Sequence, residues 1–288
     1  MSTPINKTLL LRESFPFMGD TAVIEASSLD AFSYARQRLW DLEQAWDSAA
    51  RSSDISRLND AESSRVSIQR ETAALLSYAR EAHGRTGGLY DPTMRSSLCE
   101  TEREYAAGSG DVTGLILEEI GDIWWAELPT GTVDPGGISR GLAADIVAEE
   151  IARRYPSPTG VAVSIGGGVR VVGMTRPVNI VHPLTGLLID PTECHNGAVA
   201  TSNIFGKAIG DADAPSPGHV PDPRTLANPQ HGVLQVSVAA STCVWSQAVA
   251  LACLVAGSLE VASTLGFGAL AVLRDGTILR NTYWSSSL

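Results

Sequence analysis

The chain of 288 residues lacks the positive charge that nucleic-acid binding requires. Lysine and arginine together number 21, against 32 aspartate and glutamate residues, and the formal net charge is −11. So few cations cannot neutralise a run of phosphates, and the sequence therefore predicts no nucleic-acid partner. One small phosphorylated ligand remains compatible with this charge, because backbone N–H groups and a helix dipole can hold an anion.

Cysteines and long apolar segments are also scarce. The four cysteines show no CxxC spacing and occur at Cys99, Cys194, Cys243 and Cys253. This scatter argues against structural zinc and predicts reduced thiols in a cytoplasmic protein. The most apolar segment, residues 244–256, has about 13 residues, whereas a membrane span takes about 20. We therefore expect a buried helix and no membrane span there, and residues 1–17 lack the apolar centre of a signal peptide.

Apolar residues make up 44% of the chain, which is enough to build a core. Alternating or continuous apolar stretches predict strands at 18–26, 115–125, 161–165, 169–174, 178–181, 233–239, 269–273 and 277–280. Apolar residues at helical spacing predict helices at 30–50, 70–83, 138–154 and 244–256. Polar and turn-forming residues predict loops at 84–94 and 208–232, and residues 51–60 form a polar stretch between two predicted helices. Strands and helices mix without strict β–α–β alternation, which favours an α+β fold.

Two glycine-rich segments could approach a phosphate. In residues 133–145, VDPGGISRGLAAD, a glycine turn opens a predicted helix, so N–H groups and the positive end of the dipole gather at 136–138. No GK[ST] follows, which excludes a Walker loop, and an ordinary helix start is the alternative. In residues 164–173, SIGGGVRVVG, a strand follows the glycines instead of the helix of a dinucleotide fingerprint. These glycines allow close approach either of a ligand or of a neighbouring helix.

Residues 218–226, GHVPDPRTL, hold a candidate general base. A neutral imidazole at His219 could take a proton from an attacking hydroxyl, and the carboxylate of Asp222 could orient it. The alternative is a solvent-exposed loop histidine.

Two other motifs carry groups that could contact a cofactor. Tyr90, in GGLYDPTM, could stack on a flat ring or be buried in the core, and Asp91 before a proline is a common turn residue. Thr201 and Ser202, in AVATSNIFG, could bond a ligand or cap a turn.

The order of these motifs resembles that of the ApbE-type family, the FAD:protein FMN transferases. Along residues 18–280 it reads MG, SDISRLN, GGLYDPTM, VDPGGISRG, SIGGG, ATS, HVPDPRT, and a VSV strand with an apolar helix. The resemblance implies one domain over residues 1–288, an α+β fold related to the T-fold, with FAD in a cleft between two intimately packed sheet-and-helix lobes. It implies transfer of FMN from FAD to a Thr or Ser hydroxyl of an acceptor protein with release of AMP, or hydrolysis of FAD to FMN and AMP. It also implies Mg²⁺ at the pyrophosphate.

The resemblance assigns roles to particular residues of this chain. The expected FAD-binding residues are Met18, Leu89, Tyr90, Asp91, Asp134, Gly136, Gly137, Arg140, Thr201, Ser202 and Pro221. His219 matches the general base, with Asp222 beside it, and the metal positions are Gly137 and Gln247.

The chain departs from the family pattern at the metal. The family reads A-D-A-x-x-T where this chain reads SQAVAL, so Gln247 replaces the aspartate and Leu251 the threonine. An amide oxygen is a weak ligand for Mg²⁺, and leucine supplies none. Gly168 also replaces the aspartate of GGD, and Arg140 stands where lysine is usual. Two hypotheses follow: a transferase with an altered metal requirement, in which Arg140 or Arg170 could supply charge, or a non-catalytic FAD-binding protein.

Overall fold

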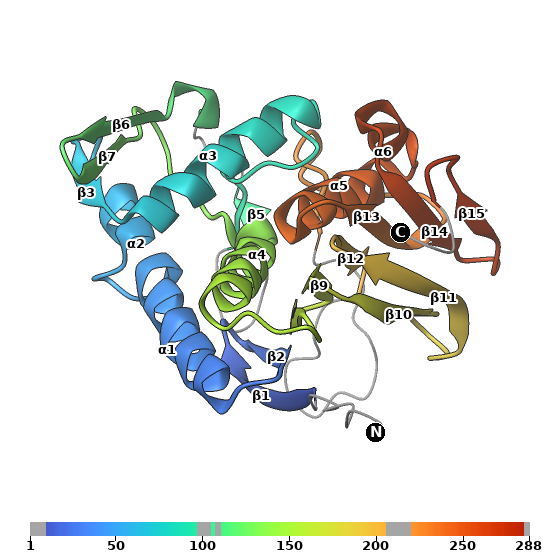
Figure 1. Ribbon diagram of the computed structural model, residues 1–288. Helices are drawn as coiled ribbons and strands as arrows, with labels where there is room; N and C mark the ends of the chain where they lie inside the picture. The colour runs from blue at the N-terminus through green and yellow to red at the C-terminus, as the bar shows by residue number, and fades with distance from the viewer. Residues whose placement is uncertain (1–9, 97–104, 107–110, 206–219, 285–288) are drawn as a thin grey trace, which may run out of the picture.

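The computed structural model describes residues 10–96, 105–106, 111–205 and 220–284, and an eight-stranded sheet runs through them (Figure 1). In spatial order its strands are β1 (Leu11–Phe17), β2 (Asp20–Ala26), β8 (Val161–Ile165), β9 (Gly168–Val172), β12 (Ala198–Asn203), β13 (Val233–Ala240), β14 (Gly268–Leu273) and β15 (Ile278–Arg280). Every neighbouring pair is antiparallel. The β9–β12 pair joins the two halves of the chain within one sheet.

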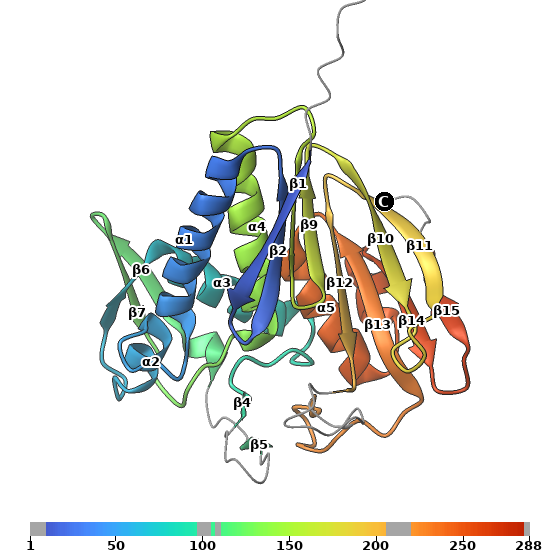
Figure 2. The same cartoon turned by 90° about the horizontal axis from the view of Figure 1, so that it is seen from below.

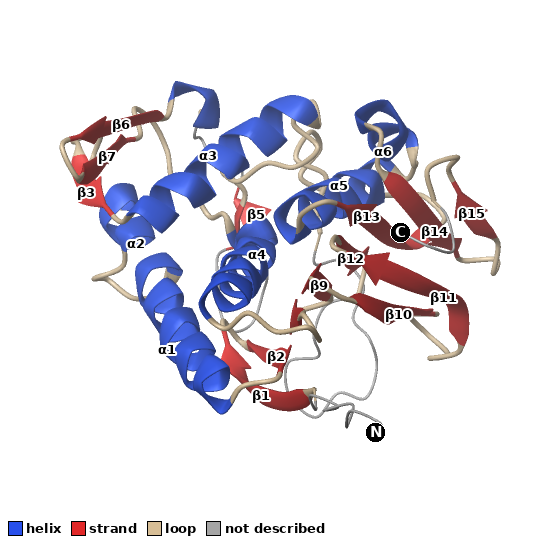
Figure 3. Cartoon of the chain, in the orientation of Figure 1, coloured by secondary structure: helices blue, strands red, loops and turns tan. Residues whose placement is uncertain are grey.

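The long helices cover one face of this sheet (Figures 1 and 3). α1 (Leu29–Trp46) and α4 (Gly136–Arg154) pack over β1, β2, β8 and β9, while α5 (Cys243–Ala256) packs over β12 and β13. α3 (Arg70–Arg85) crosses these helices, and α6 (Glu260–Leu265) follows α5. The largest core cluster lies between α1, α4 and the first strands, because their apolar faces meet there.

A hairpin covers part of the opposite face. Its strands are β10 (Thr175–Val181) and β11 (Leu188–His195), seen beside β9 and β12 in Figure 2. Residues of β9, β10, β11 and β14 share a second apolar cluster. The side chain of Gln235 on β13 donates to the carbonyl of Val181 at 3.0 Å. Consequently β13 is buried on both faces, and its Gln235 and Ser237 are buried together with its apolar residues.

A smaller sheet lies at the far end of the helical layer. Its order is β3 (Val66–Ile68), β7 (Ile123–Glu127) and β6 (Ile116–Ile120), and it shares a small core with α2 (Asp54–Asn59) and α3. A short 3₁₀ turn (Val112–Gly114) and the β4–β5 pair (Arg95–Ser96 with Tyr105–Ala106) complete the described elements. Among all of these, no helix is long and apolar enough to cross a membrane.

The expected mixed α and β architecture is confirmed, and most predicted elements occur within a few residues of their bounds. The first predicted helix is too long. α1 ends at Trp46 because Asp47 adopts an extended conformation and its carboxylate accepts a bond from the Ala49 N–H at 2.9 Å.

The polar stretch at 51–60, for which no helix was predicted, contains α2. Ser53 caps this helix by accepting from the Ser56 N–H at 3.0 Å, and Asp54 accepts from the hydroxyl of Thr72 at 2.6 Å. A polar sequence therefore forms a buried turn of helix through its own capping bonds. Strands β1, β11 and β12 were not predicted, since their sequences lack a regular apolar pattern.

Candidate functional site

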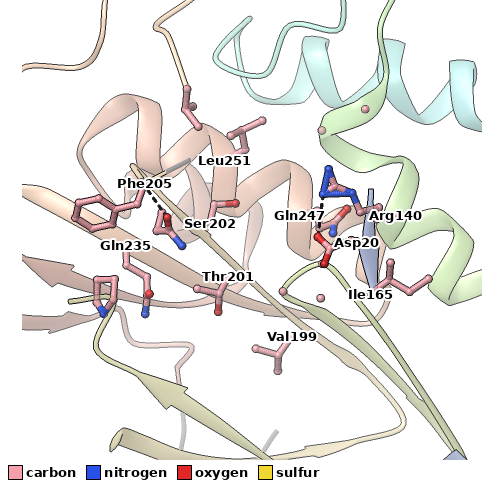
Figure 4. Close-up of a pocket in the computed structure, with 18 of the residues that line it drawn as sticks. Asp20, Arg140, Ile165, Val199, Thr201, Ser202, Phe205, Gln235, Gln247 and Leu251 are labelled. Atoms are coloured by element: carbon pink, nitrogen blue, oxygen red, sulfur yellow. Dashed lines mark hydrogen bonds and ion pairs between the residues drawn. The ribbon is translucent and has the colours of Figure 1, made fainter. Parts of the chain in front are cut away.

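A cleft of about 1220 Å³ opens where several loops and element ends meet (Figure 4). The β1–β2 turn, the loop after α3, the start of α4 and the β8–β9 turn contribute to its wall, together with parts of β10, β12 and α5. The wall includes these residues predicted from the sequence: Leu89, Tyr90, Asp91, Asp134, Gly136, Gly137, Arg140, Thr201, Ser202, Pro221 and Gln247. Segments far apart in the chain therefore converge on one cavity.

The glycine turn between β8 and β9 fits tightly against its neighbours. Gly166 has φ +54, and a Cβ there would lie 2.8 Å from Cδ of Arg140 and 2.9 Å from a carboxylate oxygen of Asp20. A Cβ at Gly168 would lie 2.6 Å from the sulfur of Cys243. The positive φ favours glycine at Gly166, and at Gly168 the space of a side chain is already filled. The sequence left two explanations for these glycines, the close approach of a ligand or of a neighbouring element. Close packing within the protein explains Gly166 and Gly168.

The start of α4 forms another part of the wall. The carboxylate of Asp134 accepts from the Gly136 N–H at 3.0 Å, which fixes the first turn. A Cβ at Gly137 would lie 3.2 Å from the Tyr90 ring and 3.3 Å from a methyl of Leu251. The absence of a side chain at Gly137 thus brings the positive end of the α4 dipole to the cleft surface.

Tyr90 is a buried residue of this wall with a polar group. It is 2% exposed, and its hydroxyl has no hydrogen-bond partner among the residues that the structure describes. Burial raises the pKa of Tyr90 well above its ordinary value, and the charges of Asp134 and Asp91 raise it further. The hydroxyl is therefore a neutral donor with no acceptor in the described part of the chain, as expected where a ligand or water supplies one.

The predicted metal positions hold no arrangement suited to Mg²⁺. The side-chain oxygen of Gln247 accepts from the Gly141 N–H at 2.8 Å, and Leu251 presents methyl groups beside Gly137. In the described parts of the chain, no group of three or more His, Cys, Asp or Glu residues could hold a metal ion. Mg²⁺ binds mainly through carboxylates, water and phosphate, so these residues do not fit it.

Asp145 organises the site from behind although it does not line the cleft. Its carboxylate accepts from the Cys243 N–H at 2.7 Å and the Val244 N–H at 2.9 Å, which fixes the first turn of α5. Burial raises the pKa of Asp145 to about 7, against the lowering effect of these bonds and of Arg170. By holding the start of α5, Asp145 fixes where Gln247 and Leu251 lie.

Three predicted residues do not form part of the described wall. Met18 lies in the β1–β2 turn at φ +46, where its N–H donates to Glu43 at 2.7 Å. Asp222 is mostly buried, and its carboxylate accepts from the guanidinium of Arg224 at 2.7 and 2.9 Å. These bonds with Arg224 hold the pKa of Asp222 below its ordinary value. His219 lies outside the described residues, so its position relative to Asp222 stays a prediction.

The wall also contains residues to which the sequence assigned no role, namely Asp20, Ile165, His182, Val199, Phe205 and Gln235. Val199 could have been found, because it lies two residues before Thr201 and side chains two apart in a strand share a face. Asp20 carries no comparable signal, since only the fold brings it within 3.6 Å of Arg140.

A family model for the ApbE family matches residues 18–271, and the chain therefore belongs to that family. None of the curated protein sequences compared with the chain matches it.

Solved structures of ApbE proteins have the same fold. An ApbE protein from Thermotoga maritima has a TM-score of 0.82 at 20% identity, covering 95% of this chain and 97% of its own. The flavin transferase ApbE from Vibrio cholerae has a TM-score of 0.74 at 19% identity, with 96% and 98% covered. The apo flavinyl transferase ApbE from Pseudomonas stutzeri has a TM-score of 0.79 at 16% identity, with 98% and 97% covered.

Proposed function

We propose that this chain transfers FMN from FAD to a Thr or Ser hydroxyl of an acceptor protein and releases AMP. The observation that carries the proposal is the cleft, in which the separate segments expected to bind FAD meet. Membership of the ApbE family and the names of the Vibrio cholerae and Pseudomonas stutzeri structures agree with it. We also propose that residues 1–288 act as one domain, which agrees with the continuous sheet.

The cleft has the properties that FAD requires. Its volume of about 1220 Å³ is larger than the roughly 300–1,000 Å³ of ordinary small-molecule pockets, as suits a dinucleotide. Leu89, Val199 and Phe205 offer apolar surface for the flat ring. The start of α4 and Arg140 offer positive potential, and the unpaired hydroxyl of Tyr90 offers a donor.

The chemistry needs a base and a well-placed phosphate. The acceptor oxygen forms a bond to the phosphorus of the FMN half, the bond from that phosphorus to the bridging oxygen breaks, and AMP leaves with this oxygen. We assign the removal of the hydroxyl proton to His219 on the sequence pattern. Pro221 and Pro223 line the cleft, so the segment that follows His219 reaches the same cavity. Asp222 is ionised and held by Arg224, and it anchors this segment.

A resident Mg²⁺ is expected from the family, but the residues at its place do not fit it, and we derive no step through a metal. A cytoplasmic location is a further proposal. It is supported by Cys194, Cys243 and Cys253, which are buried free thiols.

The test uses purified protein with FAD and a threonine-containing peptide. AMP would be measured by chromatography and covalent flavin by in-gel fluorescence, in EDTA and in millimolar MgCl₂. We expect FAD to bind and AMP to form with the protein but not with the His219→Ala variant, which should still bind FAD. Failure to bind FAD at about micromolar concentration under either condition would remove the proposal. Binding without AMP or flavinylated peptide would favour a protein that only holds FAD.

A further inference from the structure

The side-chain amide of Gln247 already has a hydrogen-bond partner in the protein. Its carbonyl oxygen accepts the Gly141 N–H of α4 at 2.8 Å, and a Cβ at Gly141 would lie 2.7 Å from that oxygen. The side chain is 9% exposed. Gln247 therefore ties α5 to α4 as a structural bridge, and its oxygen points to a backbone donor.

Position 168, where the family pattern also has a carboxylate, has no room for a side chain either. Gly168 stands where the family pattern has the aspartate of GGD, and a Cβ there would lie 2.6 Å from the Cys243 sulfur and 3.2 Å from the Gln247 amide nitrogen. A side chain at position 168 would have to displace both groups. The substitutions at 168 and 247 are thus compatible with each other in space, and together they remove two negative charges from this corner.

The third position is apolar. A methyl of Leu251 lies 3.3 Å from where a Cβ of Gly137 would be, so this position places hydrocarbon, and no oxygen ligand, beside the exposed start of α4. The carboxylates that line the cleft have other partners: Asp91 accepts from the Thr93 N–H at 2.8 Å, and Asp134 accepts from the Gly136 N–H at 3.0 Å. The third, Asp20, lies 3.6 Å from the guanidinium of Arg140.

Positive charge is nevertheless present. Arg140 is the one arginine or lysine among the described residues of the cleft wall, and its side chain is 35% exposed. It rests against Gly166 of the glycine turn, and its guanidinium lies 3.6 Å from Asp20 (Figure 4). Such a partly exposed pair is weak, so a phosphate can compete for the guanidinium. A guanidinium can also donate two parallel bonds to phosphate oxygens.

From these contacts we infer that this chain binds the pyrophosphate of FAD without a divalent cation, and that the guanidinium of Arg140 supplies the positive charge. The start of α4 adds about half an elementary charge on the same wall, where Tyr90 adds an unpaired buried hydroxyl. This inference rests on the proposed function, because it concerns how the same cleft holds FAD.

The first experiment measures FAD affinity by isothermal titration calorimetry, once in EDTA and once in millimolar MgCl₂. We expect the two dissociation constants of the wild-type protein to agree within about twofold, since no metal takes part. If Mg²⁺ tightens FAD binding by about tenfold or more, the inference is overturned while the proposed function stands. If FAD binds in neither buffer, the proposed function itself fails.

The second experiment replaces the positively charged side chain of Arg140. Arg140→Gln should weaken FAD binding by about tenfold to a hundredfold, the range for losing a hydrogen bond to a charged group. Riboflavin has no phosphate, so its affinity should stay the same. The matched control is Arg65→Gln, because Arg65 is 39% exposed and paired with Glu118 on the distant small sheet.

A third variant keeps the test decisive if Arg140→Gln disturbs the fold. Arg140→Lys retains the charge but loses the two-pronged geometry, and we expect FAD affinity between those of the wild type and the glutamine variant, with an unchanged thermal midpoint. If both Arg140 variants bind FAD as tightly as the wild type, Arg140 does not hold the pyrophosphate and that part of the inference is wrong.

Discussion

Asp145 should make the stability of this protein fall as the pH rises towards neutrality, and Asp145→Asn should remove that fall. The carboxylate is buried behind the first turn of α5, where it accepts from the Cys243 and Val244 N–H groups. The nearest cation, Arg170, lies 3.3 Å from it. Burial nevertheless dominates and raises the pKa from 3.8 to about 7.

The sign of the effect follows from proton uptake. In the unfolded chain Asp145 ionises near its ordinary pKa, whereas in the folded protein it holds its proton up to about pH 7. Folding between these values takes up a proton, so the contribution is complete below about pH 4 and is lost as the pH rises through about 7. At about 1.4 kcal/mol for each pH unit, the whole contribution is about 4 kcal/mol.

The assay is urea unfolding of the wild type and of Asp145→Asn from about pH 5 to about pH 8. Asparagine cannot accept both backbone bonds, which costs about 1–3 kcal/mol at every pH. The variant should therefore be less stable than the wild type at the acid end. Because the wild type loses about 3 kcal/mol towards pH 8, the gap should close or reverse there.

Asp222→Asn provides the control, because Arg224 lowers the pKa of Asp222. The stability that Asp222 contributes is present above its ordinary pKa and is lost only in more acid solution, so this gap should stay constant over the same range. If the curves of the wild type and Asp145→Asn run parallel, the reasoning about Asp145 is refuted.

Three further outcomes test the cleft and its packing. Restoring the family pattern with Gln247→Asp and Leu251→Thr should make FAD affinity rise with Mg²⁺ by about tenfold, measured by calorimetry; an affinity that does not respond would mean that more than these positions excludes the metal. Gly168→Ala should lower the free energy of unfolding by about 1–3 kcal/mol, because its Cβ would lie 2.6 Å from a sulfur. In contrast, Gly84→Ala in the open space on α3 should raise it by about 0.5–1 kcal/mol, and equal effects would contradict the packing argument. Tyr90→Phe should leave the thermal midpoint unchanged or higher but weaken FAD binding about threefold to thirtyfold, because the lost hydroxyl has no partner among the described residues; unchanged binding would exclude it as a ligand donor.

The cleft shows how a degraded motif can remain well packed. Gln247, Gly141 and Gly168 fit one another closely, so the departures from the family pattern are part of a formed interface between α4 and α5. An active site needs groups held by their neighbours, and this corner meets that condition for positioning, while positions 168 and 247 offer no carboxylate to a cation. The charge of Arg140 then becomes the feature on which ligand binding depends.

Much of the architecture could be read from local patterns. The strand at Val161–Ile165 and the helix α5 were predicted closely, because continuous apolar sequence leaves few alternatives to burial. The sequence failed where polar residues are satisfied by tertiary partners. α2 and β1 are such elements, since capping bonds form the first and pairing with β2 forms the second.

The sequence by itself determined the family resemblance and the departures at Gln247 and Leu251. It also supplied the motifs that are proposed to bind FAD. Motif order and residue identity are properties of the chain, so they need no coordinates. Only the tertiary structure decided that Gln247 is bonded to Gly141, that Gly168 has no room for a side chain, and that Asp20 lies beside Arg140. These facts depend on how separate elements pack, and contacts between residues far apart in the sequence leave no local pattern.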